Sequence, residues 1–294
     1  MTISVKYAQP GGVGNRLASA SNYPFCQTDA FLELEKMIGL KSVKKTIAEI
    51  SAYALIQTKR SQQSLKADAT ALHMIFRGNP GTGKTSVARI LGDIFREMGI
   101  LKKGHLMEVE RADLVGEYIG HTAQKTRDVI KKANGGILFI DEAYTLVQGG
   151  SKDFGHEAIA TLVKSMEDQR DDMIVILAGY CLEMDAFMLS NPGLRSRFAI
   201  QIDFPDYNSE ELFNIGLQMY NERDYELNSG SRWRLKCLLD EFVKYRHPHS
   251  GNARYVRNLV EKSIRLQALR LVDREYLNRK DLMTIEETDL PTAK

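Results

Sequence analysis

One stretch of the chain combines glycines, a lysine and a threonine at the spacing that phosphate binding requires. It runs Gly78-Asn79-Pro80-Gly81-Thr82-Gly83-Lys84-Thr85 and is followed by Ser86. A triphosphate needs several backbone N–H groups that converge on its oxygens, and glycines let the backbone approach without side chains in the way. Lys84 can reach the β- and γ-phosphates, and the Thr85 hydroxyl can bind Mg²⁺. The spacing therefore predicts that Gly78 to Ser86 bind ATP together with Mg²⁺.

Two adjacent acids follow an apolar run further along the chain. Residues 137–140 are all apolar, and Asp141 and Glu142 come directly after them. Asp141 can hold Mg²⁺, directly or through water, and Glu142 can orient and polarise the water that attacks the γ-phosphate. Two exposed acids without a role are the alternative for such a pair taken alone. About 55 residues after a phosphate-binding loop, the pair predicts ATP hydrolysis.

Both motifs lie in a region where apolar runs alternate with segments of helical spacing. Strands are expected over 72–76, 104–109, 137–140, 173–178 and 200–204, and helices over 40–58, from 86 onward, over 123–132 and over 159–166. The helix after the phosphate-binding stretch would direct its N-terminus at the phosphates. This strand–loop–helix context argues against a chance glycine-rich turn. Strands that alternate with helices predict an α/β fold, a parallel sheet with helices on both faces.

The residue pattern changes on either side of this region. The first thirty residues carry scattered glycine, serine and asparagine without any period, which predicts a flexible tail. After Pro205 no run typical of a strand appears, and Asn208, three residues before Glu211, predicts a helix cap. We therefore expect three parts, namely a tail over 1–30, an α/β ATPase domain over 31–206 and a small all-helical domain over 207–294.

Composition narrows the class of protein further. The 294 residues include 40 basic and 38 acidic side chains, a net charge of +2, which is not the balance of a dedicated nucleic-acid binder. No apolar run is long enough to span a membrane and the N-terminus lacks a signal-peptide core, so we expect a cytoplasmic protein. Cys26, Cys181 and Cys237 are isolated, which excludes zinc-ligand spacing. His247 and His249 suit an exposed loop better than a metal pair, because no cysteine or carboxylate clusters beside them.

Further motifs, taken in order, resemble those of AAA+ ATPases. After the phosphate-binding stretch come Ile137-Leu138-Phe139-Ile140-Asp141-Glu142-Ala143, Asn191-Pro192-Gly193-Leu194-Arg195-Ser196-Arg197-Phe198 and Gly251-Asn252-Ala253-Arg254. The chain looks like the branch of red-type rubisco activases and the stage V sporulation protein K of spore-forming bacteria. The span 104–207 is most similar to the sporulation member, notably over 110–128. The resemblance covers residues 37–290 and implies an ATPase domain followed by a helical lid domain.

The resemblance also implies roles for individual arginines. Arg197 stands where AAA+ proteins carry the arginine finger, which reaches the γ-phosphate bound to a neighbouring subunit and stabilises charge in the transition state. Arg195 is the alternative finger or an auxiliary to it, and two surface arginines without a role are the competing interpretation. Arg254 matches the lid-domain arginine called sensor 2, by which the lid responds to the nucleotide. Arg257, one helical turn on, is a less favoured substitute.

Two more residues are included in the expected ATP site. Tyr180 follows the strand of 173–178 where many AAA+ proteins have a polar sensor 1, commonly asparagine, so this chain departs from the family pattern. The Tyr180 hydroxyl can still form a hydrogen bond, and a packing role is the equal alternative. Gly39 belongs to the small apolar turn before the helix of 40–58 and is also assigned to the ATP-binding residues.

Tyr118-Ile119-Gly120 matches the aromatic–hydrophobic–glycine pore loop of AAA+ remodellers. An aromatic ring on a loop can grip many peptide sequences, because it contacts backbone and apolar surface without demanding a particular partner. Gly116 and Gly120 flank the tyrosine and favour a loop. The alternative is a core tyrosine packed between a strand and a helix.

Taken together, the resemblance implies an ATPase that forms a ring of identical subunits, expected to be a hexamer, and pulls a peptide of a protein partner into its pore. A ring is needed because Arg197 cannot easily reach phosphates bound to its own subunit. We expect a role in bacterial sporulation, and a red-type rubisco activase is the alternative within the branch. Neither the remodelled protein nor a sugar-phosphate ligand can be inferred from these residues.

Three other classes compete with this interpretation. A nucleic-acid motor or loader would carry a basic pore or an added binding module, and the pore-loop match and near-neutral charge argue against it. A scaffold that binds nucleotide without turnover would need neither Glu142 nor Arg197. A P-loop kinase would need no finger, lid arginine or pore loop.

Overall fold

The structure, a computed structural model, describes residues 27–66, 72–118, 120–148, 153–168, 172–247 and 249–291. Most of the expected tail, residues 1–26, lies outside the described residues. The chain divides into two compact units. The first extends to Gly78 and continues over Lys84–Phe204, and the second consists of Asn79–Gly83 and the residues from Pro205 onward. The boundary predicted from the sequence, after residue 206, falls two residues beyond this division.

A five-stranded parallel sheet forms the centre of the first unit, in the order β2-β3-β4-β1-β5. The strands are β1 (Met74–Arg77), β2 (Leu106–Val109), β3 (Ile137–Ile140), β4 (Ile174–Gly179) and β5 (Ile200–Asp203). All of β3 and β4 is buried, because both strands have neighbours on either side and helices over both faces. The predicted α/β fold with a parallel sheet is confirmed.

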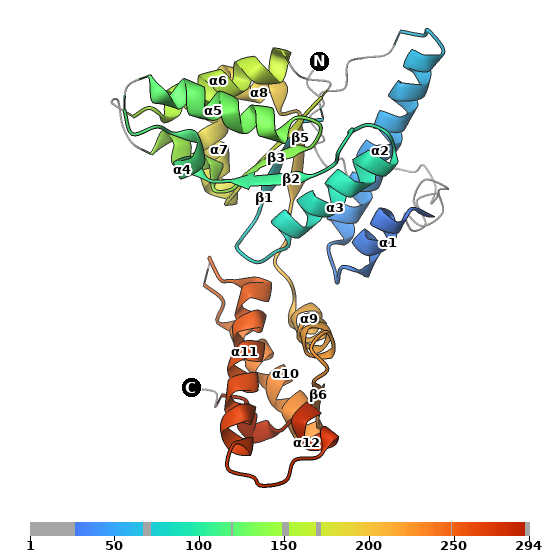
Figure 1. Ribbon diagram of the computed structural model, residues 1–294, viewed down its shortest axis with the longest axis vertical. Coiled ribbons are helices and arrows are strands. Elements are labelled where there is room, and N and C mark those ends of the chain that lie inside the picture. Colours follow the sequence, from blue (N-terminus) through green and yellow to red (C-terminus); the bar gives the residue numbers. More distant parts are fainter. Residues whose placement is uncertain are drawn as a thin grey trace. The chain divides into compact units, whose positions relative to one another are not determined.

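Helices cover both faces of this sheet. Figure 1 shows α1 (Asp29–Lys36), α2 (Lys41–Gln62) and α3 (Lys84–Glu97) on one side, and α5 (His121–Ala133), α6 (Gly155–Asp168) and α8 (Pro192–Arg197) on the other. Three further pieces complete the unit: α4 (Arg111–Leu114), the 3₁₀ helix η3 (Ala143–Val147) and α7 (Cys181–Ser190). Helix α2 extends four residues beyond its predicted end, and α1 begins inside the expected tail. Helices α4 and α7 were not predicted from the sequence.

One hydrophobic core of the first unit packs between the sheet and α5, α6 and α7. It includes Leu138 and Ile140 of β3, Val175 and Leu177 of β4, and Phe187 of α7, each at most 1% exposed. These strands therefore hold their carboxyl ends in fixed positions. In a parallel sheet these ends meet at one edge, which is where ligands bind in open α/β sheets.

The second unit is mainly helical. Its elements are α9 (Ser209–Asn221), β6 (Glu226–Leu227), α10 (Ser229–Lys244), α11 (Asn252–Leu271), α12 (Arg279–Met283), β7 (Thr284–Ile285) and the 3₁₀ helix η4 (Glu287–Asp289). The predicted cap of α9 is present, because the Asn208 side chain accepts a hydrogen bond from the Glu211 N–H at 2.8 Å.

The second unit also corrects the expectation of an all-helical domain. Two-residue strands β6 and β7 pair in parallel, with Glu226 opposite Thr284 and Leu227 opposite Ile285. Pairs this short carry no alternation that a sequence pattern could reveal. In the part of the chain that the structure describes, no helix is long and apolar enough to cross a membrane.

Candidate nucleotide site

The phosphate-binding stretch connects β1 to α3, as the sequence predicts. Helix α3 begins at Lys84, whose ammonium donates a hydrogen bond to the Gly78 carbonyl at 2.8 Å. Gly78 has a φ of +156°, and a Cβ there would lie 2.5 Å from the Phe204 carbonyl oxygen. Arg77, just before it, bonds both carboxylate oxygens of Asp203 on β5, at 2.7 and 3.0 Å. The entry to the loop is therefore fixed from the neighbouring strand, and only glycine fits at its first position.

The expected Mg²⁺ ligands are hard oxygens at the edge where the strands end. Thr85 stands in the first turn of α3, and Asp141 directly follows β3, with its N–H bonded to the Val109 carbonyl at 3.0 Å. Hydroxyl and carboxylate oxygens are the donors that Mg²⁺ prefers, usually together with waters and substrate phosphates. Thr85 and Asp141 therefore fit an Mg²⁺ ion whose other ligands are nucleotide phosphates and water.

Glu142 has a backbone conformation that sets it apart from Asp141. Its φ is +46°, in the left-handed region, and its N–H donates to the Asp141 carboxylate at 3.0 Å. Left-handed conformation in a residue other than glycine is uncommon and is seen at functional sites. The separate roles predicted for Asp141 with metal and Glu142 with water stay predictions.

Glu108 of β2 is a third acid near Thr85 and Asp141, and it was not among the site residues predicted from the sequence. The Thr85 hydroxyl donates to its carboxylate at 3.5 Å, a long contact. Glu108 pairs with Phe139 in the parallel register, and Asp141 lies two residues further along the same face. The alternation of side chains along β2 could have placed Glu108 on one face of the sheet. Its position beside Asp141 depends on the register between β2 and β3, which the sequence does not show.

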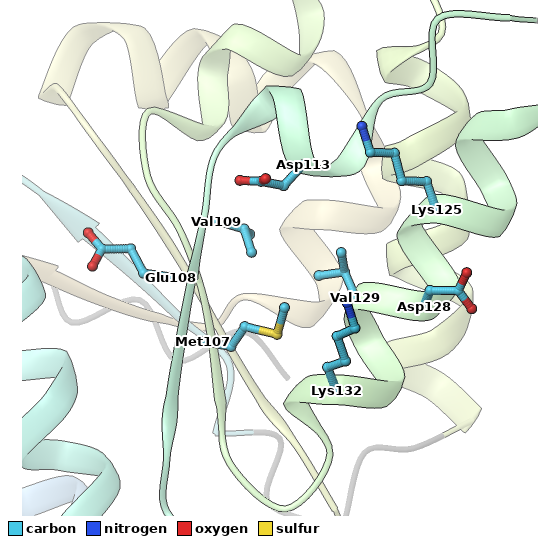
Figure 2. Close-up of a pocket in the computed structure, with 8 residues that line it drawn as sticks. All are labelled: Met107, Glu108, Val109, Asp113, Lys125, Asp128, Val129 and Lys132. Carbon is cyan, nitrogen blue, oxygen red and sulfur yellow. The ribbon is translucent and has the colours of Figure 1, made fainter.

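A pocket of ≈ 390 Å³ lies on the other side of β2. Figure 2 shows Glu108 pointing away from the side on which Lys125, Asp128 and Val129 of α5 lie. The Lys125 ammonium is already bonded to the carbonyls of Ala112 and Val115, at 2.6 and 3.2 Å. We assign no ligand to this pocket, because its charges are of mixed sign.

Tyr180 packs beside a second tyrosine near these acids. It precedes α7, and its ring lies 5.7 Å from that of Tyr144, centre to centre. Burial, and then the charge of Glu142, raise the pKa of Tyr144 well above its ordinary value. Tyr180 therefore has a packing contact, and its role as a nucleotide sensor stays a prediction.

Arg197 ends α8 and is held by its own subunit. The Asn191 side chain accepts a hydrogen bond from Gly193 N–H at 2.8 Å and so caps this short helix. The Arg197 guanidinium bonds the Glu167 carboxylate of α6 at 2.7 Å and the Gly193 carbonyl at 3.3 Å. Arg195 is exposed. The choice between the two as a finger stays a prediction.

A buried histidine supports the end of α8. The ring of His73 lies 5.9 Å from that of Phe198, the residue after Arg197, and His73 is only 2% exposed. Burial lowers the pKa of His73 to about 4, and the charge of Arg197 acts in the same direction. His73 therefore stays neutral at physiological pH, so it packs against α8 without adding a charge there.

The segment before α5 presents Tyr118 to solvent. Its side chain is 66% exposed, and its ring meets that of His121 edge to face at 5.6 Å. This exposure is incompatible with the core alternative considered from the sequence. Gly116 N–H donates to the Thr122 hydroxyl at 3.0 Å, which anchors the start of the segment. Ile119 lies outside the described residues.

The remaining predicted residues occupy turns and a helix start. Gly39 has a φ of +68° and precedes Leu40, which is buried and also left-handed at +54°. Arg254 lies in the first turn of α11, and its N–H donates to the Gly251 carbonyl at 2.7 Å. Their contacts with nucleotide stay predictions. The imidazoles of His247 and His249 lie 6.1 Å apart, and no third ligand joins them among the described residues.

A parallel sheet with a glycine-rich phosphate loop after one strand and two acids after another defines the class of P-loop nucleotide hydrolases. The model described as ATPase family associated with various cellular activities (AAA) matches residues 74–206, and the AAA lid domain model matches 208–294. The chain therefore belongs to the AAA family within this class, and it is an ATP hydrolase. The resemblance stated from the sequence is thereby confirmed.

Individual relatives share most of their length with the chain. Stage V sporulation protein K of Bacillus subtilis (strain 168) is 56% identical over 259 residues, which are 88% of this chain and 80% of that protein. The chloroplastic ribulose bisphosphate carboxylase/oxygenase activase of Cyanidioschyzon merolae is 46% identical over 260 residues, 87% of each chain. The RuvB Holliday junction branch migration motor of Thermotoga maritima superposes with a TM-score of 0.54 at 19% identity, over 85% of this chain and 69% of that one. At that identity the likeness concerns the fold alone.

Proposed function

We propose that this ATPase assembles as a ring, a hexamer, and remodels a protein by drawing a peptide segment into its pore with Tyr118. The observation that carries the proposal is the 66% exposure of Tyr118, a large ring on a segment anchored at Gly116 and ended by Gly120. The exposed Tyr118 side chain is therefore accessible to a peptide. Aromatic contact suits such a role, because it tolerates many sequences.

Within this proposal the chain's own residues have separate roles in hydrolysis. Lys84 and the loop N–H groups bind the phosphates of ATP, and Thr85 and Asp141 hold Mg²⁺, which neutralises phosphate charge when bound. Glu142 orients the attacking water. Arg197, with Arg195 as the alternative, stabilises the transition state at the nucleotide of the adjacent subunit. Arg197 must break its ion pair with Glu167 before it can reach that nucleotide.

The relatives suggest which protein is remodelled. We propose a cytoplasmic role in sporulation, because the sporulation relative shares 56% of aligned residues against 46% for the rubisco activase. Activation of rubisco is the competing candidate, and it rests on the rubisco activase that is 46% identical to this chain. Release of inhibited rubisco by the purified protein with ATP, at rates matching a rubisco activase, would decide for that candidate.

Mixed assemblies test the ring directly. Arg197→Ala and Glu142→Gln should each lose most ATP hydrolysis while they retain ATP binding. When the two variants are mixed, hydrolysis should return in part, because an intact Arg197 on one subunit can serve an intact Glu142 on its neighbour. Assembly of mixed rings is verified by mass, and Glu183→Gln on α7, a part-buried acid outside the proposed chemistry, is the matched control for Glu142→Gln. Mixed rings without any recovery of activity would rule out a finger that acts between subunits.

A further inference from the structure

The carboxylate of Asp206 is surrounded by hydrogen-bond donors within the second unit. The Asn79 amide donates to both of its oxygens at 3.1 Å, and the Asn252 amide donates to one at 2.7 Å. The Arg246 guanidinium lies 3.1 Å from the other oxygen. Asp206 therefore connects the phosphate-binding loop, through Asn79, to the start of α11, through Asn252.

Asn252 is an unusual residue for the beginning of a helix. It is completely buried, and its φ of +39° is in the left-handed region. Its amide oxygen accepts from the Tyr207 N–H at 3.1 Å, and its amide N–H₂ also reaches the Pro80 carbonyl at 3.3 Å. A buried, non-glycine residue in this conformation costs free energy, which the surrounding hydrogen bonds must offset.

The same region binds consecutive carbonyl groups of the loop. The Gly81 carbonyl accepts from the Ala253 N–H at 3.1 Å, and the Thr82 carbonyl accepts from the Tyr207 hydroxyl at 3.2 Å. The fit is close, because a Cβ on Gly81 would lie 2.2 Å from the Gly251 carbonyl oxygen. Three successive carbonyls, those of Pro80, Gly81 and Thr82, thus accept hydrogen bonds from Asn252, Ala253 and Tyr207, respectively.

This arrangement determines where the N–H groups of the loop point. In a trans peptide the C=O of one residue and the N–H of the next lie on opposite sides of the C–N bond. Each of these three carbonyls points at its hydrogen-bond donor, so the N–H groups that follow them, those of Gly81, Thr82 and Gly83, point away from those donors. N–H groups presented in series are what a phosphate requires.

We propose that Asp206 and Asn252 are positioning residues of the ATPase, which hold three carbonyls of the phosphate loop so that the next three N–H groups are oriented for phosphate before nucleotide arrives. The proposal rests on the assignment of residues 78–86 as the ATP site. The negative charge of Asp206 also supports an orienting role. A carboxylate beside a loop that must accept a polyanion opposes binding by simple electrostatics. Orientation therefore explains its presence, and attraction does not.

Asp206→Asn separates orientation from electrostatics by the sign of its effect. The new amide places donors against the donors of Asn79, Asn252 and Arg246, so the loop should lose its shape, and ADP affinity should fall about tenfold. If the side chain acted only through its charge, removing that charge would strengthen ADP binding. Asp273→Asn, which removes an exposed charge from the same unit, is the matched control and should leave affinity unchanged. Titration with a fluorescent ADP analogue measures both.

Asn252→Gly tests the second residue without backbone strain, because glycine adopts a positive φ readily. We expect KM for ATP to rise about tenfold while kcat at saturating ATP stays within about threefold, since saturating nucleotide can order the loop itself. Asn228→Gly is the control for general loss of stability. It removes the side chain that caps α10 by accepting a hydrogen bond from Ser231 N–H at 2.8 Å. Equal KM values for the wild type and Asn252→Gly would overturn the proposal.

Folding and nucleotide binding are checked separately so that each result can be interpreted. If either variant unfolds, which circular dichroism would show, Asn79→Ala removes the loop's own side-chain contact while the helical unit keeps its remaining bonds. That variant should also weaken ADP binding several-fold, and unchanged affinity would reject the proposal. A wild-type protein that binds neither ADP nor ATP would instead refute the nucleotide site itself, on which the proposed function depends.

Discussion

The phosphate loop and the segment before α5, which carry the two proposed functions, differ in what surrounds their glycines. In the phosphate loop, a Cβ on Gly78 or Gly81 would come within 2.5 Å of a backbone oxygen, so both are surrounded by protein. In the segment before α5, Gly120 also has a positive φ, at +84°, but nothing lies within 4 Å of the place a Cβ would take. Tyr118 beside it is 66% exposed. The first loop is shaped by contacts with its own protein, whereas the second presents a side chain outward.

The largest expected difference between the loops concerns nucleotide affinity. Lys84→Ala should weaken ATP binding at least a hundredfold, because the phosphates lose their main charged side-chain partner. Tyr118→Ala should leave ATP affinity within about threefold, because the ring lies outside the chemical site. Equilibrium titration with a fluorescent ATP analogue compares the two. Equal affinity of Lys84→Ala and the wild type would refute the assignment of the phosphate loop.

A matched pair of glycine substitutions gives the next largest effect. Gly81→Ala should lower the free energy of unfolding by about 2–4 kcal/mol, because it combines a positive φ with a steric clash against the backbone. Gly120→Ala should cost only about 1 kcal/mol, because its positive φ is the sole penalty. Urea unfolding of both variants measures the difference. Similar costs for the two would mean that the loops are packed alike, contrary to the comparison.

The smallest expected effect on stability belongs to Tyr118 itself. Tyr118→Ala should change the free energy of unfolding by less than about 1 kcal/mol, whereas truncation of a buried aromatic costs ~3–5 kcal/mol. Basal ATP hydrolysis should stay within a few-fold of the wild type, while stimulation by a partner peptide is lost. Tyr118→Phe should retain most of that stimulation, because the proposed grip is apolar. A ring-deficient Tyr118→Ala would remove the threading mechanism and leave the ATPase.

The sequence was informative where chemistry and burial act on neighbouring residues. The run of 137–140 is buried on both faces, so its apolar character predicted β3 to the residue. The ends of β1 and α2 were misplaced because edges of elements depend on tertiary contacts. Asp206 and Asn252 were missed as partners of the loop because Asn252 and Pro80 are 172 residues apart. No local pattern relates positions so distant.

That separation has a consequence for how the protein is made. The residues that bond to the loop from Asp206 onward leave the ribosome long after Gly81, and Asn252 follows Pro80 by 172 residues. At a synthesis rate of about 5–20 residues per second, roughly 10–30 s pass between the two. During this interval the nascent ATPase has its lysine and its acids but lacks the groups that orient its loop. If these groups orient the loop as proposed, a growing chain captures ATP poorly, and nucleotide capture becomes a property of the finished subunit.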